Sequence, residues 1–128
     1  MVKGIEHVAI FSKDSKALSD WYKEMFDLKT VYDNGKGTYF LAFESGDMIE
    51  FCMTDILEDK KNEKTSGIRH FAFSVDVADF DAMVKKIKDS GAEVVTDAVT
   101  TAKGVSTFFF RDIDGNVSHL IARTEPLY

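Results

Sequence analysis

Apolar residues alternate with polar or small residues in two short stretches of the chain that are nearly the same. The first reads GIEHVAI at residues 4–10, and the second reads GIRHFAF at residues 67–73. Alternation with a period of two is typical of a β-strand whose faces meet different surroundings. We therefore expect strands over 5–11 and 71–77, with His7 and His70 on the face opposite the bulkier side chains.

A helical pattern follows each of these strands. Apolar residues recur at helical spacing between residues 17 and 28, after Asp14 or Ser15 as the N-cap. The second helix is expected to begin at Asp76 or Asp79 and to end at Gly91. The apolar positions that define the two helical faces are Leu18, Trp21, Tyr22, Met25 and Phe26, then Phe80, Met83, Val84 and Ile87.

The other apolar segments have the composition of strands and are joined by turn residues. Ser45-Gly46 and Asp114-Gly115 are typical hairpin turns. The expected strands cover residues 38–43, 48–53, 93–96, 106–111 and 117–122. Each half of the chain is thus predicted to run from a strand to a helix and then to further strands.

The two halves are an internal repeat. His70 lies 63 positions after His7, and the later strands repeat with an offset of 69 positions, so the second copy contains six extra residues. Two copies are too few for a solenoid and indicate a pair of modules in one domain. We expect one domain over residues 1–128, with modules at 1–53 and 67–124 and a polar linker at 54–66.

Composition and charge exclude several classes of protein. The chain has 128 residues, 45% of them hydrophobic, which is the size of one ordinary domain. Its 16 basic and 22 acidic residues give a net charge of -6, which argues against nucleic acid as a partner. No apolar run is long enough to span a membrane, and the single cysteine, Cys52, cannot form an internal disulfide. We expect a cytoplasmic protein.

All three histidines of the chain fall at strand positions related by the repeat. His119 occupies in the second copy the position that Glu50 occupies in the first. Imidazole and carboxylate groups bind Zn, Ni, Co, Fe or Mn, and a carboxylate buried beside imidazoles without a cation would be costly. The pattern therefore predicts a site for a divalent transition metal formed by His7, Glu50, His70 and His119.

The chain resembles the vicinal oxygen chelate superfamily, which includes glyoxalase I, methylmalonyl-CoA epimerase, extradiol dioxygenases, and fosfomycin- and bleomycin-resistance proteins. The resemblance covers nearly the whole chain and rests on the segments 5–10, 21–28, 49–51, 68–73, 103–104 and 112–116. It implies an α+β fold in which two βαβββ modules form a cup-shaped mixed sheet around a metal, commonly in a homodimer. By position, His7, Glu50, His70 and His119 would be the ligands. His119 departs from the family pattern, which has a glutamate there.

The resemblance implies a metal-dependent lyase or isomerase of the glyoxalase I type. Its substrate would be a small 2-oxoaldehyde thiol adduct or a related carbonyl compound, converted through an enediolate held by the metal. Glu50 is the expected catalytic base, because no other matched ligand is a carboxylate. We expect the substrate to contact Lys103, Phe108, Phe110 and Arg111.

Three alternatives use the same residues differently. An extradiol dioxygenase would need two histidines, one carboxylate and three open metal positions, which a fourth ligand would crowd. A metal-free resistance protein would bind a drug against an aromatic wall. A closed structural metal site would hold no exchangeable water. The aromatic residues available for the wall are Trp21, Tyr39, Phe40, Phe43, Phe108, Phe109 and Phe110.

Overall fold

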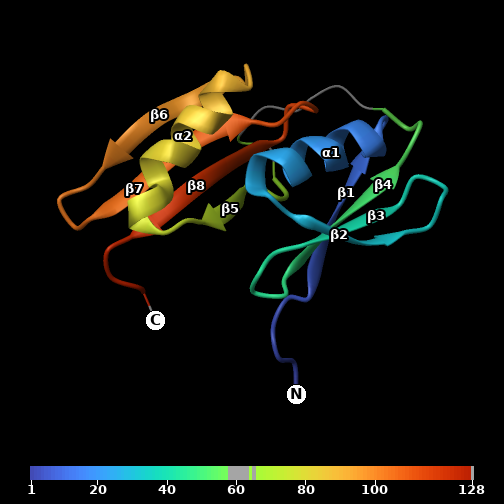
Figure 1. The fold of residues 1–128 in the computed structure, drawn as a ribbon, viewed down its shortest axis with the longest axis horizontal. Helices are drawn as coiled ribbons and strands as arrows, with labels where there is room; N and C mark the ends of the chain where they lie inside the picture. The colour runs from blue at the N-terminus through green and yellow to red at the C-terminus, as the bar shows by residue number, and fades with distance from the viewer. Residues whose placement is uncertain (58–63, 65, 128) are drawn as a thin grey trace. The chain divides into compact units, whose positions relative to one another are not determined.

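A computed structural model describes residues 1–57, 64 and 66–127, which fall into two compact units with the same order of elements (Figure 1). Unit 1 is Met1–Lys60 and unit 2 is Lys61–Tyr128. Unit 1 contains β1 (His7–Ser12), α1 (Ser15–Phe26), β2 (Lys29–Asp33), β3 (Tyr39–Ala42) and β4 (Met48–Met53). Unit 2 contains β5 (Phe71–Ser74), a 3-10 turn (Val77–Asp79), α2 (Phe80–Asp89), β6 (Val94–Thr100), β7 (Val105–Arg111) and β8 (Val117–Arg123).

Each unit is a βαβββ module with its own four-stranded mixed sheet. The strand order is β1-β4-β3-β2 in unit 1 and β5-β8-β7-β6 in unit 2. In both, the first and last strands of the module pair in parallel, and the remaining neighbours are antiparallel. The predicted α+β class with two βαβββ modules is therefore confirmed. The predicted linker at 54–66 lies largely outside the described residues.

The strand register reproduces the offsets found in the sequence. Ala9 pairs with Glu50 across β1 and β4, and Ala72 pairs with His119 across β5 and β8. Phe40 and Phe109 likewise stand opposite Glu50 and His119. The six extra residues of the second copy fall between the end of α2 and β7, where β6 has seven residues against five in β2.

Helix α1 covers one face of the unit 1 sheet. The Asp14 side chain accepts a hydrogen bond from the Ala17 backbone N–H, which satisfies one of the free donors at the helix start and confirms the expected N-cap. The apolar face of the helix packs on inward side chains of the sheet. The buried residues of this core are Leu18, Tyr22, Met25, Leu41, Ile49 and Phe51.

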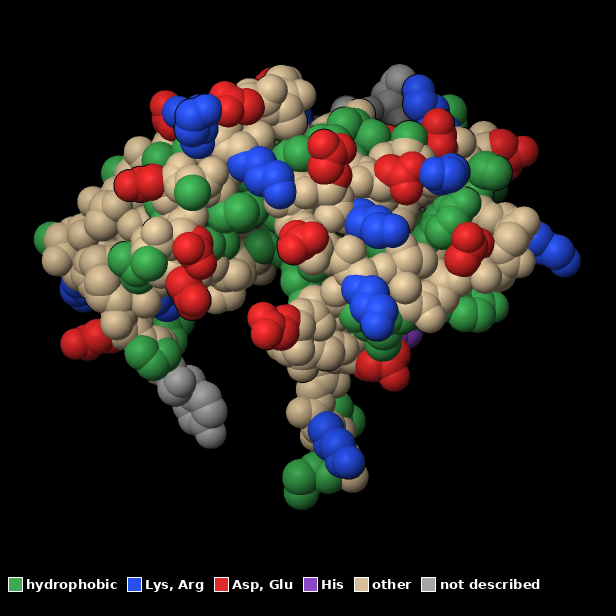
Figure 2. All heavy atoms as spheres, viewed as in Figure 1, with side chains coloured by type: hydrophobic (Ala, Val, Ile, Leu, Met, Phe, Trp, Pro, Cys, Tyr) green, Lys and Arg blue, Asp and Glu red, His purple; other side chains and the backbone are tan. Residues whose placement is uncertain are grey.

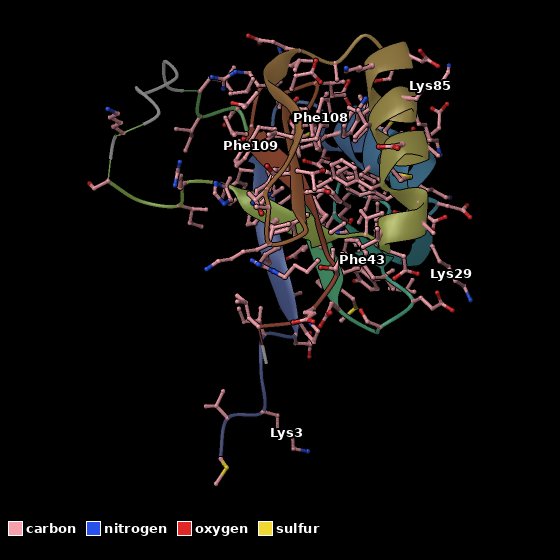
Figure 3. The ribbon with its side chains drawn as sticks, turned by 90° about the vertical axis from the view of Figure 1, so that its left-hand side faces the viewer. Lys3, Lys29, Phe43, Lys85, Phe108 and Phe109 are labelled. Atoms are coloured by element: carbon pink, nitrogen blue, oxygen red, sulfur yellow. The ribbon has the colours of Figure 1, made fainter. Side chains whose placement is uncertain are left out.

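Helix α2 covers the corresponding face in unit 2. It ends at Asp89, and Gly91 follows with φ of 85°, the left-handed conformation that glycine adopts without strain. Figure 3 shows Phe108 on the helix side of the sheet and Phe109 on the other side. The buried core residues are Phe80, Val84, Ile87, Phe108, Phe110, Leu120 and Ala122. The sheet face away from the helix is thus free for another role.

The outer surfaces of the helices carry mixed charge. Lys16 pairs with Asp20 on α1 at 2.6 Å, and Lys85 pairs with Asp89 on α2. In Figure 2, basic and acidic side chains are interspersed over the helix side of each unit. No described helix is long and apolar enough to cross a membrane.

Candidate metal and substrate site

His7 and Glu50 lie side by side on the sheet face of unit 1 that α1 leaves uncovered. The His7 Nε2 atom is 3.7 Å from Glu50 Oε1, and the Glu50 side chain is 22% exposed. The His7 Nδ1 atom is 2.9 Å from the Glu6 carboxylate. A hydrogen bond from Nδ1–H to that carboxylate leaves the Nε2 lone pair directed toward Glu50.

Two neighbours complete the surroundings of this pair. The Phe40 ring meets His7 edge-on with centroids 5.3 Å apart. Cys52 follows Glu50 on the same face of β4, and burial together with the Glu50 carboxylate raises the pKa of its thiol. The raised pKa favours the neutral thiol in the metal-free protein.

His70 and His119 form the corresponding pair in unit 2. Their ring centroids are 4.5 Å apart with planes at 88°. The Phe109 ring stacks on His119 at 4.3 Å and meets His70 edge-on at 5.5 Å. His119 is 6% exposed, so this pair has a more buried member than the pair in unit 1.

Burial favours the neutral form of both unit 2 histidines. The His119 Nδ1 atom is 3.2 Å from the Leu120 carbonyl oxygen, which selects the Nδ1–H tautomer and leaves Nε2 with its lone pair. Burial lowers the pKa of His119, and this effect outweighs the opposing one of the hydrogen bond to Leu120; the charges of His70, Arg69 and Arg123 act in the same direction as burial. Burial and then Arg69 lower the pKa of His70. A neutral imidazole is the form that binds a metal.

A pocket of about 500 Å³ lies in unit 2 beside this pair. Its wall runs from Arg69 and His70, which directly precede β5, across β8 and β7 to β6. Two cationic side chains, Lys64 and Arg69, contribute to the wall, and no carboxylate is among the described residues that line it. The lining residues are Lys64, Arg69, His70, Val95, Thr96, Phe109 and Val117.

The structure corrects part of the expected substrate contacts. Phe108 and Phe110 are fully buried and stack on each other in the core under α2, because alternation along β7 turns them away from the histidines. Phe109 lines the pocket instead. Sequence reasoning had included Phe109 only in the aromatic wall, although its repeat position opposite His119 was available as a signal.

Two further predicted contacts do not line the pocket. Lys103 is exposed in the turn between β6 and β7. The Arg111 Nη1 atom donates to the Gly115 carbonyl oxygen at 2.9 Å, and its Nε lies 3.5 Å from Glu93. Arg69 and Lys64 are the cations that do reach the pocket, and neither was among the predicted site residues.

The four predicted ligands therefore form two pairs, one in each unit. Within either unit, the described residues bring no three potential ligand side chains together. In both units, however, one histidine has its Nδ1–H bonded to an oxygen, as metal-binding histidines in proteins almost always do. The donor types in each pair suit a divalent transition metal, and the four-ligand site stays a prediction.

Two βαβββ modules, with one histidine at the start of β1 and one directly before β5, define the class of glyoxalase-like proteins. A family model described as the Glyoxalase/Bleomycin resistance protein/Dioxygenase superfamily matches residues 4–120. The chain belongs to this superfamily, and the resemblance found in the sequence is confirmed.

Among curated relatives, the chain is similar to the fosfomycin resistance protein FosX of Listeria innocua. The two are 24% identical over 124 residues, which cover 97% of this chain and 92% of the relative. It is also 22% identical to FosX of Mesorhizobium japonicum, over 94% of this chain and 86% of the relative.

Solved structures share the fold. A glyoxalase/bleomycin resistance protein/dioxygenase domain from Frankia has a TM-score of 0.81 and 22% identity, covering 98% of this chain and 95% of that one. A variant of FosX from Listeria monocytogenes, complexed with Mn(II) and 1S,2S-dihydroxypropylphosphonic acid, has a TM-score of 0.77 and 21% identity, covering 99% and 94%.

Proposed function

We propose that the protein is a metal-dependent enzyme in which His7, Glu50, His70 and His119 together hold one divalent transition metal. The observation that carries this proposal is the facing of His7 Nε2 and Glu50 Oε1 at 3.7 Å. Two electron-pair donors at that separation are within the span of two metal–ligand bonds of about 2.1 Å each. The relatives add support, because a FosX structure contains Mn(II).

Glu50 is the proposed base. It is the only carboxylate among the four proposed ligands, and its partly buried position beside His7 suits proton transfer. A bound divalent ion would supply Lewis acidity to neighbouring substrate oxygens. Glu50 would take a proton either from water or from the carbon next to those oxygens.

Addition of water to a small epoxide is the reaction we favour. The diol of propylphosphonic acid in the FosX structure is the product that water addition to the corresponding epoxide yields. In this reaction the water oxygen would bond to an epoxide carbon while the ring C–O bond breaks; Glu50 would accept one proton from the water and then return it to the opened oxygen, which regenerates the carboxylate. The curated relatives, all named fosfomycin resistance proteins, favour this reaction.

Glyoxalase-type isomerisation is the second candidate. It needs the same base and the same Lewis acid, but Glu50 would move a proton between adjacent carbons of a 2-oxoaldehyde thiol adduct. The superfamily description, which includes glyoxalases, supports it. A metal-free drug-binding protein and an extradiol dioxygenase remain the competing outcomes of the experiment.

The decisive experiment combines metal analysis with a substrate panel. Protein purified without chelator is stripped and titrated with Mn, Ni, Co and Zn, then assayed with fosfomycin, with methylglyoxal thiol adducts and with catechols under oxygen. We expect His70→Ala to lose most of its metal, and Glu50→Gln to lose turnover more completely than metal. The exposed carboxylate variant Glu44→Gln is the matched control. Full turnover after metal removal would contradict the proposal.

We also propose a homodimer. Strands β1 and β5 stand at the ends of the strand orders of their sheets, and such edges favour pairing with another chain. On the β1 side, Ile5 and Phe11 are 76% and 73% exposed. Exposed apolar groups beside a strand edge are typical of an interface. Sedimentation at micromolar concentration should give twice the monomer mass, and a monomer would contradict this.

A further inference from the structure

The two modules have opposite charge at equivalent positions. Glu6 precedes His7 in the first copy, and Arg69 precedes His70 in the second. Likewise, Glu50 of the first copy corresponds to His119 of the second. The histidine-bearing face of unit 1 therefore carries carboxylates, whereas the equivalent face of unit 2 carries a guanidinium and two imidazoles.

The modules also differ in the space they leave beside the aromatic residue of that face. Tyr32 stands opposite Phe40 in unit 1, and their rings meet edge-on at 5.8 Å. Thr96 stands opposite Phe109 in unit 2 and is much smaller. The pocket of about 500 Å³ lies there, with Thr96 and Phe109 in its wall.

The pocket has the groups that an oxyanion requires. Arg69 offers a planar fork of N–H donors that matches a carboxylate, phosphate or phosphonate in two hydrogen bonds. Lys64 adds a second positive charge, and the Thr96 hydroxyl can donate a further hydrogen bond. No described lining residue is acidic, so the described part of the wall attracts an anion.

We propose that Arg69, supported by Lys64, is the subsite for an oxyanion group of the substrate in unit 2. The anionic group binds at the cationic wall and the rest of the molecule lies against the Phe109 ring, next to the His70–His119 pair. The identification of the bound anion as the substrate rests on the proposed function. Oxyanion binding by the pocket is independent of that function, so the two claims can be tested separately.

Binding to metal-free protein tests the subsite directly. Methylphosphonate and acetate are titrated separately at constant ionic strength, and the amide shifts of unit 2 are followed by NMR. We expect Arg69→Gln to weaken methylphosphonate binding by about tenfold or more, as removal of a charged hydrogen-bonding partner does. Arg69→Lys should weaken it less. Tighter binding of methylphosphonate than acetate identifies a tetrahedral group, and the reverse order identifies a carboxylate.

Two control variants test whether the loss of binding comes from the change in overall charge and whether binding takes place in this pocket. Lys85→Gln also removes a positive charge from unit 2, but Lys85 lies on α2, on the far side of the sheet from Phe109 (Figure 3). The affinity of this variant for methylphosphonate should therefore equal that of the wild type. Thr96→Tyr introduces the residue found at the equivalent place in unit 1, and it should fill the pocket and abolish binding. Equal losses in Arg69→Gln and Lys85→Gln, or wild-type affinity in Arg69→Gln, would overturn the subsite.

The outcome also distinguishes the subsite from the proposed function. If Arg69→Gln abolishes oxyanion binding while no metal-dependent turnover is found, the subsite stands and the enzyme proposal fails. If turnover is metal-dependent but Arg69→Gln leaves both anion affinity and KM for anionic substrates unchanged, the enzyme proposal stands and the subsite is wrong. With both correct, Arg69→Gln raises KM for an anionic substrate more than it lowers kcat.

Discussion

Phe109 and His119 stand opposite each other on β7 and β8, and their rings stack with centroids 4.3 Å apart and planes inclined by only 16°. The stack covers one face of an imidazole whose Nδ1 is already bonded to the Leu120 carbonyl oxygen. Together the two contacts fix the direction of Nε2, so the orientation of a proposed ligand depends on a neighbouring aromatic ring.

Replacing Phe109 with leucine should therefore loosen His119. Aromatic pairs contribute about 0.5–1.5 kcal/mol beyond the area they bury, so we expect Phe109→Leu to lower the free energy of unfolding by about 1 kcal/mol. Metal affinity should fall as well, because the imidazole loses its fixed orientation. Urea unfolding and metal titration measure the two effects. Phe40→Leu, which removes the equivalent ring beside His7, is the comparison, and wild-type affinity in Phe109→Leu would contradict the prediction.

The Ser118→Ala variant should be more stable than the wild-type protein. Its side-chain oxygen is buried and has no hydrogen-bond partner among the described residues, and Ile49 occupies the equivalent place in the first module. A buried polar group without a partner costs about 1–3 kcal/mol, and alanine removes it at little loss of volume. We expect Ser118→Ala to raise the urea midpoint without changing the m-value.

The control for Ser118 is a serine that does have a partner. Ser15 is equally buried, and its Oγ donates to the Gly37 carbonyl oxygen at 2.6 Å. Ser15→Ala should lower the free energy of unfolding by about 1 kcal/mol, opposite in sign to Ser118→Ala. A loss of stability in both variants would show that the Ser118 hydroxyl is satisfied.

Gly104 should not tolerate a side chain. Its φ is 76°, and an added Cβ would lie 2.2 Å from Thr124 Oγ1 and 3.1 Å from Thr124 Cβ. The hydrogen bond from Thr124 N–H to the Gly104 carbonyl oxygen also ties this turn to the residue that follows β8, so the turn cannot move away easily. We expect Gly104→Ala to cost about 2–3 kcal/mol in thermal or urea unfolding.

A second glycine separates the two causes of that loss. Gly46 has φ of 97° but nothing within 4 Å of an added Cβ. Gly46→Ala should therefore show only the backbone cost of about 1 kcal/mol. Adding Thr124→Ala to Gly104→Ala should recover part of the difference, and equal losses at the two glycines would rule out the contact with Thr124.

The metal-free protein should lose stability on mild acidification. Burial lowers the pKa of both His70 and His119, so the unfolded chain binds their protons more readily than the folded one. The stability from keeping them neutral is fully present above the unfolded pKa of about 6.5 and is lost as pH falls below it. Urea unfolding between pH 7.5 and 5 should show this decline, and His70→Gln combined with His119→Gln should flatten it. An unchanged slope in the double variant would assign the decline to other groups.

The duplicated sequence predicted most of the fold and the equivalent positions of His7 and His70 and of Glu50 and His119. Because the offsets of 63 and 69 positions align complete strands, they also fixed which residues share a face, and the structure places Glu50 beside His7 and His119 beside His70. Asp14 was identifiable as an N-cap because capping depends on nearby residues only: its side chain accepts a hydrogen bond from the backbone N–H three residues later. Local capping chemistry and the internal repeat can both be recognised from the order of residues alone.

The parts that sequence reasoning missed depend on contacts across the sheet. Strand β2 was not predicted, because its residues are mostly exposed and show no buried face. Arg69 was not identified as a pocket residue, since only folding brings it near Lys64 and Thr96. Phe108 and Phe110 were assigned to substrate binding by their aromatic character, but core packing under α2 determines their place.

The parallel pairing of first and last strands has a consequence for how each module folds. His7 is in register with Met48, and Phe71 with Ser118, so the strands that close each sheet come from opposite ends of its segment of chain. Bringing two distant segments together costs loop-closure entropy before the contacts between the strands offset it. Folding therefore becomes slower as contact order rises. During synthesis, neither sheet can close until its final strand has left the ribosome. Helix α1 and the β2–β3 hairpin consist of residues that are close in sequence, so they can form before β1 pairs with β4.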